Sequence, residues 1–100
     1  MNYRAEVGSL LRMLQKADFE LENVDDGGEV HLTLENHDAI DTIMSVDMSR
    51  LIVRHTYGRA SLLIIIGNSP GELVADYFSN RSLSPILDKV VTCHSRCFET

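Results

Sequence analysis

The sequence predicts an α+β fold of the order α-β-β-α-β-β-α-α, with a four-stranded, mostly antiparallel sheet and helices on one face. Two observations lead to this class. Apolar residues recur with a helical period of about 3.6 near the N-terminus and in the last third, and with a strand period of about two between them. The turn-forming stretches 25–28 (DDGG) and 57–59 (YGR) divide the strand-like segments into hairpins. We therefore expect one domain, residues 1–100.

The first half begins with a predicted amphipathic helix and continues into the first hairpin. The helix is indicated by one apolar stripe, formed by Tyr3, Val7, Leu10, Leu11 and Leu14. Apolar and polar residues then alternate in two strands. The apolar positions, expected to face the helices, are Phe19, Leu21, Val30, Leu32 and Leu34. The polar positions, expected to face solvent, are Glu20, Glu22, His31, Thr33 and Glu35.

The second half repeats the order and adds two helices. A helix is expected over residues 38–48, followed by strands over 51–56 and 60–66. The helical spacing of Leu73, Val74, Tyr77 and Phe78 predicts a short helix over 73–78. A longer one starts at Ser84-Pro85, a capping hydroxyl followed by proline at the first helical position.

A shift of 32 residues superimposes the two helix–strand–strand units without a gap. Leu21 then falls on Val53, and Leu32 falls on Ile64. Few residues are identical between the units. The sequence therefore leaves open whether this is an internal αββ repeat or a design that the two halves share.

Composition and charge narrow the class of function. Nine basic and fifteen acidic residues give a net charge of -6, which disfavours general nucleic-acid binding. The longest apolar run is five residues and the N-terminus has no signal-peptide pattern, so we expect a cytoplasmic protein without a membrane span. Cys93 and Cys97 lie too close together on a predicted helix for an easy disulfide, which agrees with a reducing compartment.

The glycine-containing loop GNSPGE, residues 67–72, resembles a phosphate-binding turn, but its chemistry argues against one. It has no lysine after the second glycine, and Pro70 removes a backbone donor. Ser69 and Glu72 have the spacing of a capping box, and Glu72 brings a negative charge to the position where a phosphate would lie. We interpret the loop as a joint between a strand and a helix.

Other clusters of reactive side chains have simpler structural explanations. His37, Asp38 and Asp41 could serve a metal-dependent hydrolase, but Asp38 also suits the start of a helix. Cys93, His94 and Cys97 supply only part of a zinc site, and Cys97 is expected to pack as a small apolar residue. We predict neither a catalytic residue nor a cofactor or metal.

Two surfaces are better candidates for binding. The first hairpin carries five carboxylates that could recognise a basic protein surface: Glu20, Glu22, Asp25, Asp26 and Glu29. The second hairpin carries a cluster of arginines, namely Arg50, Arg54 and Arg59, which leaves nucleic-acid binding as a weaker alternative. It also carries Ile52, Leu63 and Ile65 on the side that should face away from the helices. Either the C-terminal helix covers these three residues or they form an apolar interface.

The segment GNSPGELVADYFSN, residues 67–80, resembles a stretch of small uncharacterised proteins of bacteriophages and mobile elements. The resemblance implies a cytoplasmic accessory protein that binds host or phage machinery, and it brings no catalytic motif. The acidic chain is also similar to dimeric secretion chaperones, although the helix at 38–48 interrupts the strands expected there. We therefore expect a non-enzymatic protein-interaction module that binds a protein partner, with a homodimer as one form, and with a small hydrolase as the alternative.

Overall fold

Helix α1 (Tyr3–Lys16) confirms the first predicted element and lies in the middle of the helical layer. The computed structural model describes residues 3–32, 36–67 and 72–98. Val7, Leu10, Leu11 and Leu14 are all at most 3% exposed. They are buried because their spacing places them along one side of the helix, which faces the sheet.

The strands form one antiparallel sheet in the order β2-β1-β3-β4-β5. Their bounds are β1 (Glu20–Asp25), β2 (Val30–Leu32), β3 (Met48–His55), β4 (Gly58–Ile65) and β5 (Val74–Ser79). The α+β class is confirmed, but the described residues form five strands where the sequence predicted four. The two hairpins meet at β1 and β3, so the acidic and the arginine-rich strands are neighbours.

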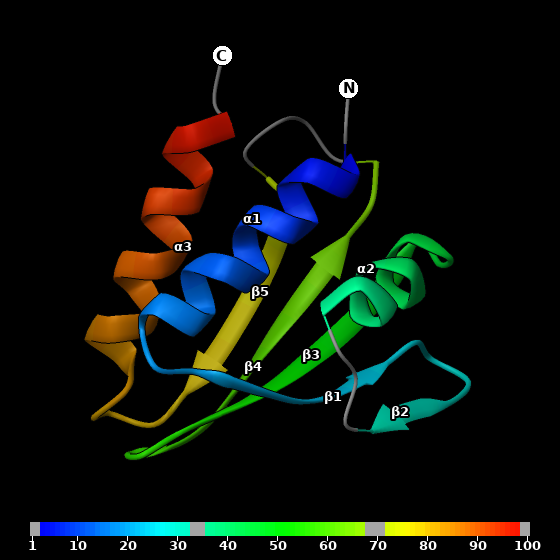
Figure 1. Ribbon diagram of the computed structural model, residues 1–100. Coiled ribbons are helices and arrows are strands. Elements are labelled where there is room, and N and C mark those ends of the chain that lie inside the picture. Colours follow the sequence, from blue (N-terminus) through cyan, green and yellow to red (C-terminus); the bar gives the residue numbers. More distant parts are fainter. Residues whose placement is uncertain (1–2, 33–35, 68–71, 99–100) are drawn as a thin grey trace.

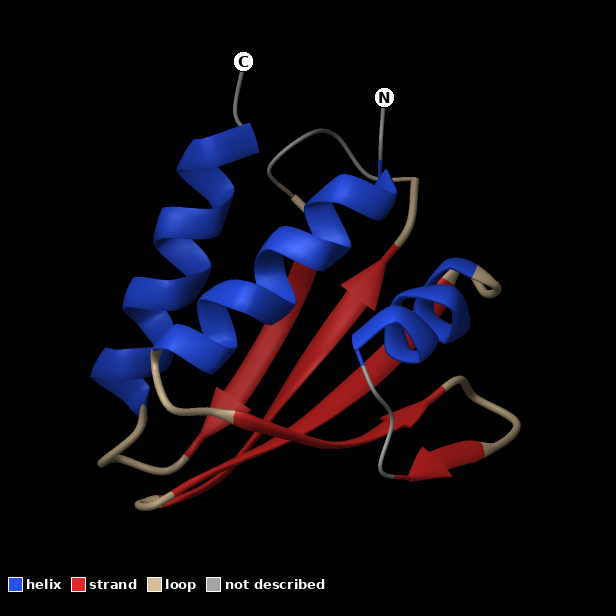
Figure 2. Ribbon diagram, in the orientation of Figure 1, coloured by secondary structure: helices blue, strands red, loops and turns tan. Residues whose placement is uncertain are grey.

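Helices α2 (Asn36–Met44) and α3 (Ser84–Phe98) lie beside α1 on the same face of the sheet (Figures 1 and 2). The core forms between this layer and the sheet, where Leu10, Ile43, Leu51, Leu62 and Leu87 are fully buried. Helix α2 ends four residues before the predicted boundary at Met48, because Met48 is the first residue of β3. The helices therefore cover one face, as the sequence predicted.

Residues 73–78, predicted as a helix, belong instead to strand β5 and the residue before it. Their spacing fits a helix, but β4 offers an edge whose backbone groups need partners. Strand β5 supplies them, with Leu62 opposite Tyr77 and Ser61 opposite Phe78. The Tyr77 hydroxyl donates a 2.6 Å hydrogen bond to Asp88 on α3, and this bond raises the pKa of Tyr77. The loop before β5 thus leads into a strand, and its residues 68–71, with the proposed cap Ser69, lie outside the described part of the chain.

A bulge in β1 reverses the side-chain alternation of the first hairpin. Leu21 is opposite Val53, but the register shifts before Asn23, so that Val24 becomes the buried residue opposite Leu51. His31 is paired with Val24, so both side chains point to the face of the sheet that the helices cover. The sequence had placed Val30 on that face. Val30 is 52% exposed on the other side. The predicted faces of β2 were therefore wrong, and Thr33 and Glu35 lie outside the described residues.

The helix–strand–strand order occurs twice, but the units differ in length. Helix α1 has 14 residues and α2 has 9, and β3 begins at Met48, four residues before the position onto which the shift moves Glu20, the first residue of β1. The gapless match of the two halves was therefore wrong. Leu21 and Val53, which the shift of 32 residues superimposes, are nevertheless direct neighbours across the β1–β3 border.

Two polar contacts hold α3 in place. His94 is 1% exposed, and its Nε2–H donates a 3.0 Å hydrogen bond to the backbone carbonyl of Glu6 on α1. Burial lowers the pKa of His94 and so favours the neutral ring. Before the helix, Asn80 accepts a hydrogen bond from the Leu83 amide and donates one to the Tyr57 carbonyl in the β3–β4 turn, at 2.9 and 2.8 Å.

Cys93 and Cys97 on α3 are free and exposed, so the expected packing of Cys97 as a buried apolar residue was wrong.

Candidate functional site

The face of the sheet that points away from the helices is the main candidate site, and we call it the open face. None of the helices in the described residues lies on it (Figure 2). Side chains alternate between the two faces along each strand. On β3 the residues on the open face are Arg50, Ile52 and Arg54. On β4 they are Arg59, Ser61, Leu63 and Ile65. The intervening residues Leu51, Val53, Leu62 and Ile64 are at most 1% exposed in the core.

The predicted interface residues Ile52, Leu63 and Ile65 lie on the open face along the neighbouring strands β3 and β4, with Ile65 at the end of β4. Cross-strand pairing sets their positions, because Leu63 is opposite Arg50 and Ile65 is opposite Met48. All three are half-buried by their neighbours in the sheet. Helix α3 lies on the other side of the sheet, against α1 and β5, and does not cover them. Of the two explanations that the sequence left open, cover by α3 is therefore wrong, and the use of these three residues as an interface stays a prediction.

Two further apolar residues extend this patch. Met48 at the start of β3 is 53% exposed, and Phe78 on β5 is 76% exposed opposite Ser61. Sequence reasoning missed Phe78 because it assigned the residue to a helix. The alternation of Met48 with Arg50 and Ile52 was a signal that could have included Met48. The apolar surface therefore reaches from β3 across β4 to the edge strand.

Two of the three arginines on the open face are paired with carboxylates of the first hairpin. Arg54 lies 3.2 Å from Glu20, and Arg59 lies 3.0 Å from Glu22. Arg50 donates a weak hydrogen bond of 3.4 Å to Ser61. The two ion pairs depend on the β1–β3 pairing, which joins the two hairpins and which the sequence could not show. Two of the five acidic candidates are thus paired with two of the three arginines.

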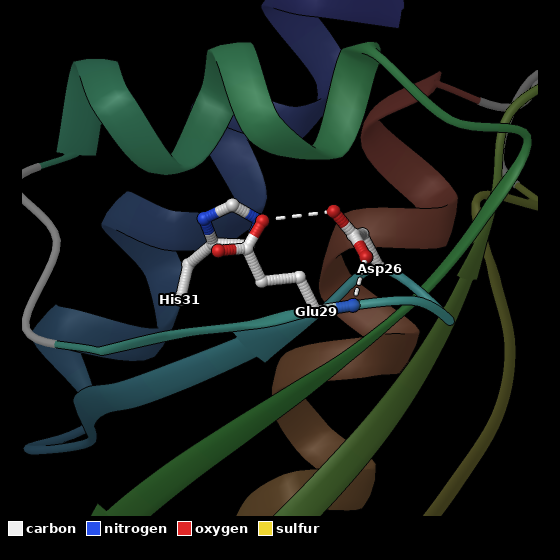
Figure 3. A group of neighbouring side chains, drawn as sticks. All are labelled: Asp26, Glu29 and His31. Carbon is white, nitrogen blue, oxygen red and sulfur yellow. Dashed lines mark hydrogen bonds and ion pairs between the residues drawn. The ribbon is translucent and has the colours of Figure 1, made fainter.

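The remaining acidic candidates, Asp25, Asp26 and Glu29, lie at the turn of the first hairpin, and their carboxylates largely organise that turn. Asp25 accepts the amide of Gly27, and Asp26 Oδ1 accepts the amides of Gly28 and Glu29, at 2.7–3.0 Å. Asp26 Oδ2 lies 2.9 Å from His31 Nε2 (Figure 3). The His31 bond and the two amide bonds lower the pKa of Asp26 to about 2.

Asp26, Glu29 and His31 are also the residues best placed to hold a metal ion. Each offers one ligand atom, and these atoms lie within 4.8 Å of one another (Figure 3). However, His31 Nε2 and the amides of Gly28 and Glu29 already contact the Asp26 carboxylate. The hydrogen bonds of the turn therefore explain the proximity of the three side chains without a metal. This group is separate from the two candidate metal clusters considered from the sequence, at residues 37–41 and 93–97. The signal that could have indicated it is the spacing D-x-x-E-x-H in residues 26–31.

The residues proposed for the hydrolase alternative do not converge in the described structure. Asp38 and Asp41 are exposed on α2, and Asp41 forms a 2.6 Å ion pair with Arg4. The side chain of His37 lies outside the described residues. A polar cavity of about 300 Å³ beside β1 is lined by Glu20, Leu21, Glu22 and Arg54, with no histidine among its described residues.

Comparisons with protein-family models, with curated proteins and with solved structures found no match. None of the helices in the described residues is long and apolar enough to cross a membrane.

Proposed function

We propose that this chain is a non-enzymatic protein-interaction module that binds another protein surface through the open face. One observation carries the proposal: Ile52, Leu63 and Ile65, extended by Met48 and Phe78, form an apolar surface on a sheet face that no described helix covers. A sheet with one covered face ordinarily has polar residues on the other. Apolar side chains that share an exposed surface with polar groups are typical of a protein interface.

The charges around the patch favour a protein partner over a nucleic acid. Arg54 and Arg59 are neutralised by Glu20 and Glu22, so the open face does not form the basic stripe that phosphates require. Paired charges of both signs also permit a second copy of the chain as the partner, since each copy can offer an acid to the other's arginine. The second copy is therefore the first partner to test.

The hydrolase alternative receives less support. General acid–base or metal chemistry needs carboxylates and a histidine that converge on one cavity. Asp38 and Asp41 are exposed, and the polar cavity beside β1 combines two carboxylates with Arg54 instead. The resemblance of residues 67–80 to bacteriophage proteins suggests host or phage machinery as the source of a partner that is not a second copy. The similarity to dimeric secretion chaperones would suit self-association.

The test compares the solution mass of the wild type with that of Ile65→Asp, by light scattering after size exclusion. We expect the wild type at twice the 11.2 kDa of one chain, and the variant as a folded monomer, because an interface cannot bury an unpaired carboxylate. The control is Thr56→Asp, which adds the same charge at an exposed turn residue and should remain dimeric. A monomeric wild type would refute self-association. An unfolded Ile65→Asp would show that Ile65 belongs to the core and would refute the open-face interface.

A further inference from the structure

A second apolar surface lies on the helical side of the molecule, between the C-terminal half of α1 and the N-terminal half of α3 (Figure 1). It is a groove of about 530 Å³ that we call the α1–α3 groove. Its lining consists of Met13, Lys16, Ala17, Pro85, Ile86, Lys89, Val90 and Cys93. The apolar side chains form its floor and walls, and the two exposed lysines add charge at its rim.

The charge of the groove is opposite to that of the chain as a whole. The protein has fifteen acidic residues and a net charge of -6, yet no carboxylate lines the groove among the described residues. Lys16 and Lys89 are the only lysines in the sequence, and both lie here. They come from different helices, so the positive charge spans the groove. The site thus combines an apolar interior with a cationic rim.

We infer that the α1–α3 groove binds an acidic amphipathic helix of a partner protein. From Pro85 to Cys93 the lining follows about 12 Å of α3, which corresponds to about two helical turns. A helix with apolar residues at positions i, i+3, i+4 and i+7 presents a stripe of this length. Glutamates beside that stripe would meet Lys16 and Lys89 as the helix packs against α1 and α3.

The same charges disfavour a second copy of this chain in the groove. A symmetric pair of chains brings the same patch of each copy together, so a two-fold interface centred here would oppose lysines to lysines. Self-association through the open face involves the other side of the sheet and leaves the groove accessible. The inference is therefore independent of the proposed function, and each can fail without the other.

The experiment uses the full chain and two synthetic helical peptides with the same leucine stripe. In one peptide the flanking positions are glutamate, and in the other they are lysine. Binding is followed by fluorescence anisotropy at about 50 mM salt, where surface charges are weakly screened. We expect the glutamate peptide to bind at least about tenfold more tightly than the lysine peptide, because two pairs change from attraction to repulsion.

A charge reversal tests the two lysines directly. In the double variant Lys16→Glu/Lys89→Glu the preference should reverse in favour of the lysine peptide. The matched control is Arg12→Glu/Arg96→Glu, which changes the charge of the same two helices by the same amount outside the groove lining. This control should keep the preference for glutamate. A preference that persists in the lysine double variant, or that is lost equally in both variants, would overturn the inference.

Alkylation of cysteines in the wild type locates the peptide without any substitution. Cys93 lines the groove, whereas Cys97 is exposed on the next turn of α3 and does not. The glutamate peptide should slow the alkylation of Cys93 severalfold and leave Cys97 unchanged. Equal rates at Cys93 with and without saturating peptide would contradict the inference, as would protection of Cys93 by dodecanoate but not by the peptide. The open-face variant Ile65→Asp should bind the peptide normally.

Discussion

Replacing Gly58 by alanine should destabilise the fold through two separable effects. Gly58 follows the β3–β4 turn with a φ of 136°, a conformation that residues with a side chain rarely adopt. A Cβ atom there would also overlap Asn80 Nδ2, which donates to the Tyr57 carbonyl. Backbone strain of this kind costs about 1–3 kcal/mol. Displacement of Asn80 adds about 0.5–1.5 kcal/mol for the lost hydrogen bond, so the free energy of unfolding should fall by about 1.5–4.5 kcal/mol.

Two other glycines provide matched controls for these effects. Gly27 has a φ of 93°, and no atom lies within 4 Å of the place that a Cβ would occupy, so Gly27→Ala should cost the strain alone, about 1–2 kcal/mol. Gly28 has neither a positive φ nor a close contact, since Asp26 Oδ1 is 3.8 Å away. Gly28→Ala should therefore raise stability by about 0.4–1 kcal/mol, because alanine restricts the unfolded chain.

Urea unfolding of the three alanine variants, compared at unchanged slope, measures these differences. The expected order of stability is Gly28→Ala, wild type, Gly27→Ala and Gly58→Ala. Equal losses at Gly58 and Gly27 would refute the role of Asn80. Equal stabilities of the Gly27 and Gly28 variants would refute the argument from backbone strain.

Two further predictions concern pH. Burial lowers the pKa of His94 in the native chain below its ordinary value of 6.5. Below about pH 6.5 His94 is therefore protonated more readily in the unfolded chain than in the native chain. Stability should thus fall between about pH 7.5 and 5.5, and by less in His94→Leu, as measured by urea unfolding at both pH values. The depressed pKa of Asp26, about 2, adds stability above its usual value of 3.8 that is lost as the pH falls towards 2. An NMR titration of its carboxyl group should give that low midpoint, and His31→Gln should raise it.

Elements defined by local patterns could be predicted from the sequence, whereas their partners could not. The stripe of α1 and the alternation of β3 and β4 involve residues close together in the chain, and both elements are confirmed. The uncovered side of Leu63 and Ile65 follows from the same alternation. The ion pair of Glu20 with Arg54 joins residues 34 positions apart, and no local pattern indicates that β1 and β3 are adjacent.

Where the sequence misled, a tertiary contact outweighed the local pattern. The spacing of Leu73 and Tyr77 suits a helix, but pairing with β4 makes the segment a strand. The bulge after Leu21 needs only one extra residue, and no glycine or proline marks it. Ile86 on α3 is half-buried and lines the α1–α3 groove. Such a groove depends on how far two helices separate, which periodicity does not encode.

The two edge strands of the sheet bear on the size of any assembly. In the described residues strand β2 has 3 residues, and the pairing of β5 with β4 contains a register shift, so neither edge is long and regular in this part of the chain. Long, regular edges allow chains to add one after another into fibres without an end point. Association through the open face does not leave a free binding surface, because two copies that pack face to face bury the surface of both. We therefore expect growth to stop at a small, fixed number of chains even at high concentration.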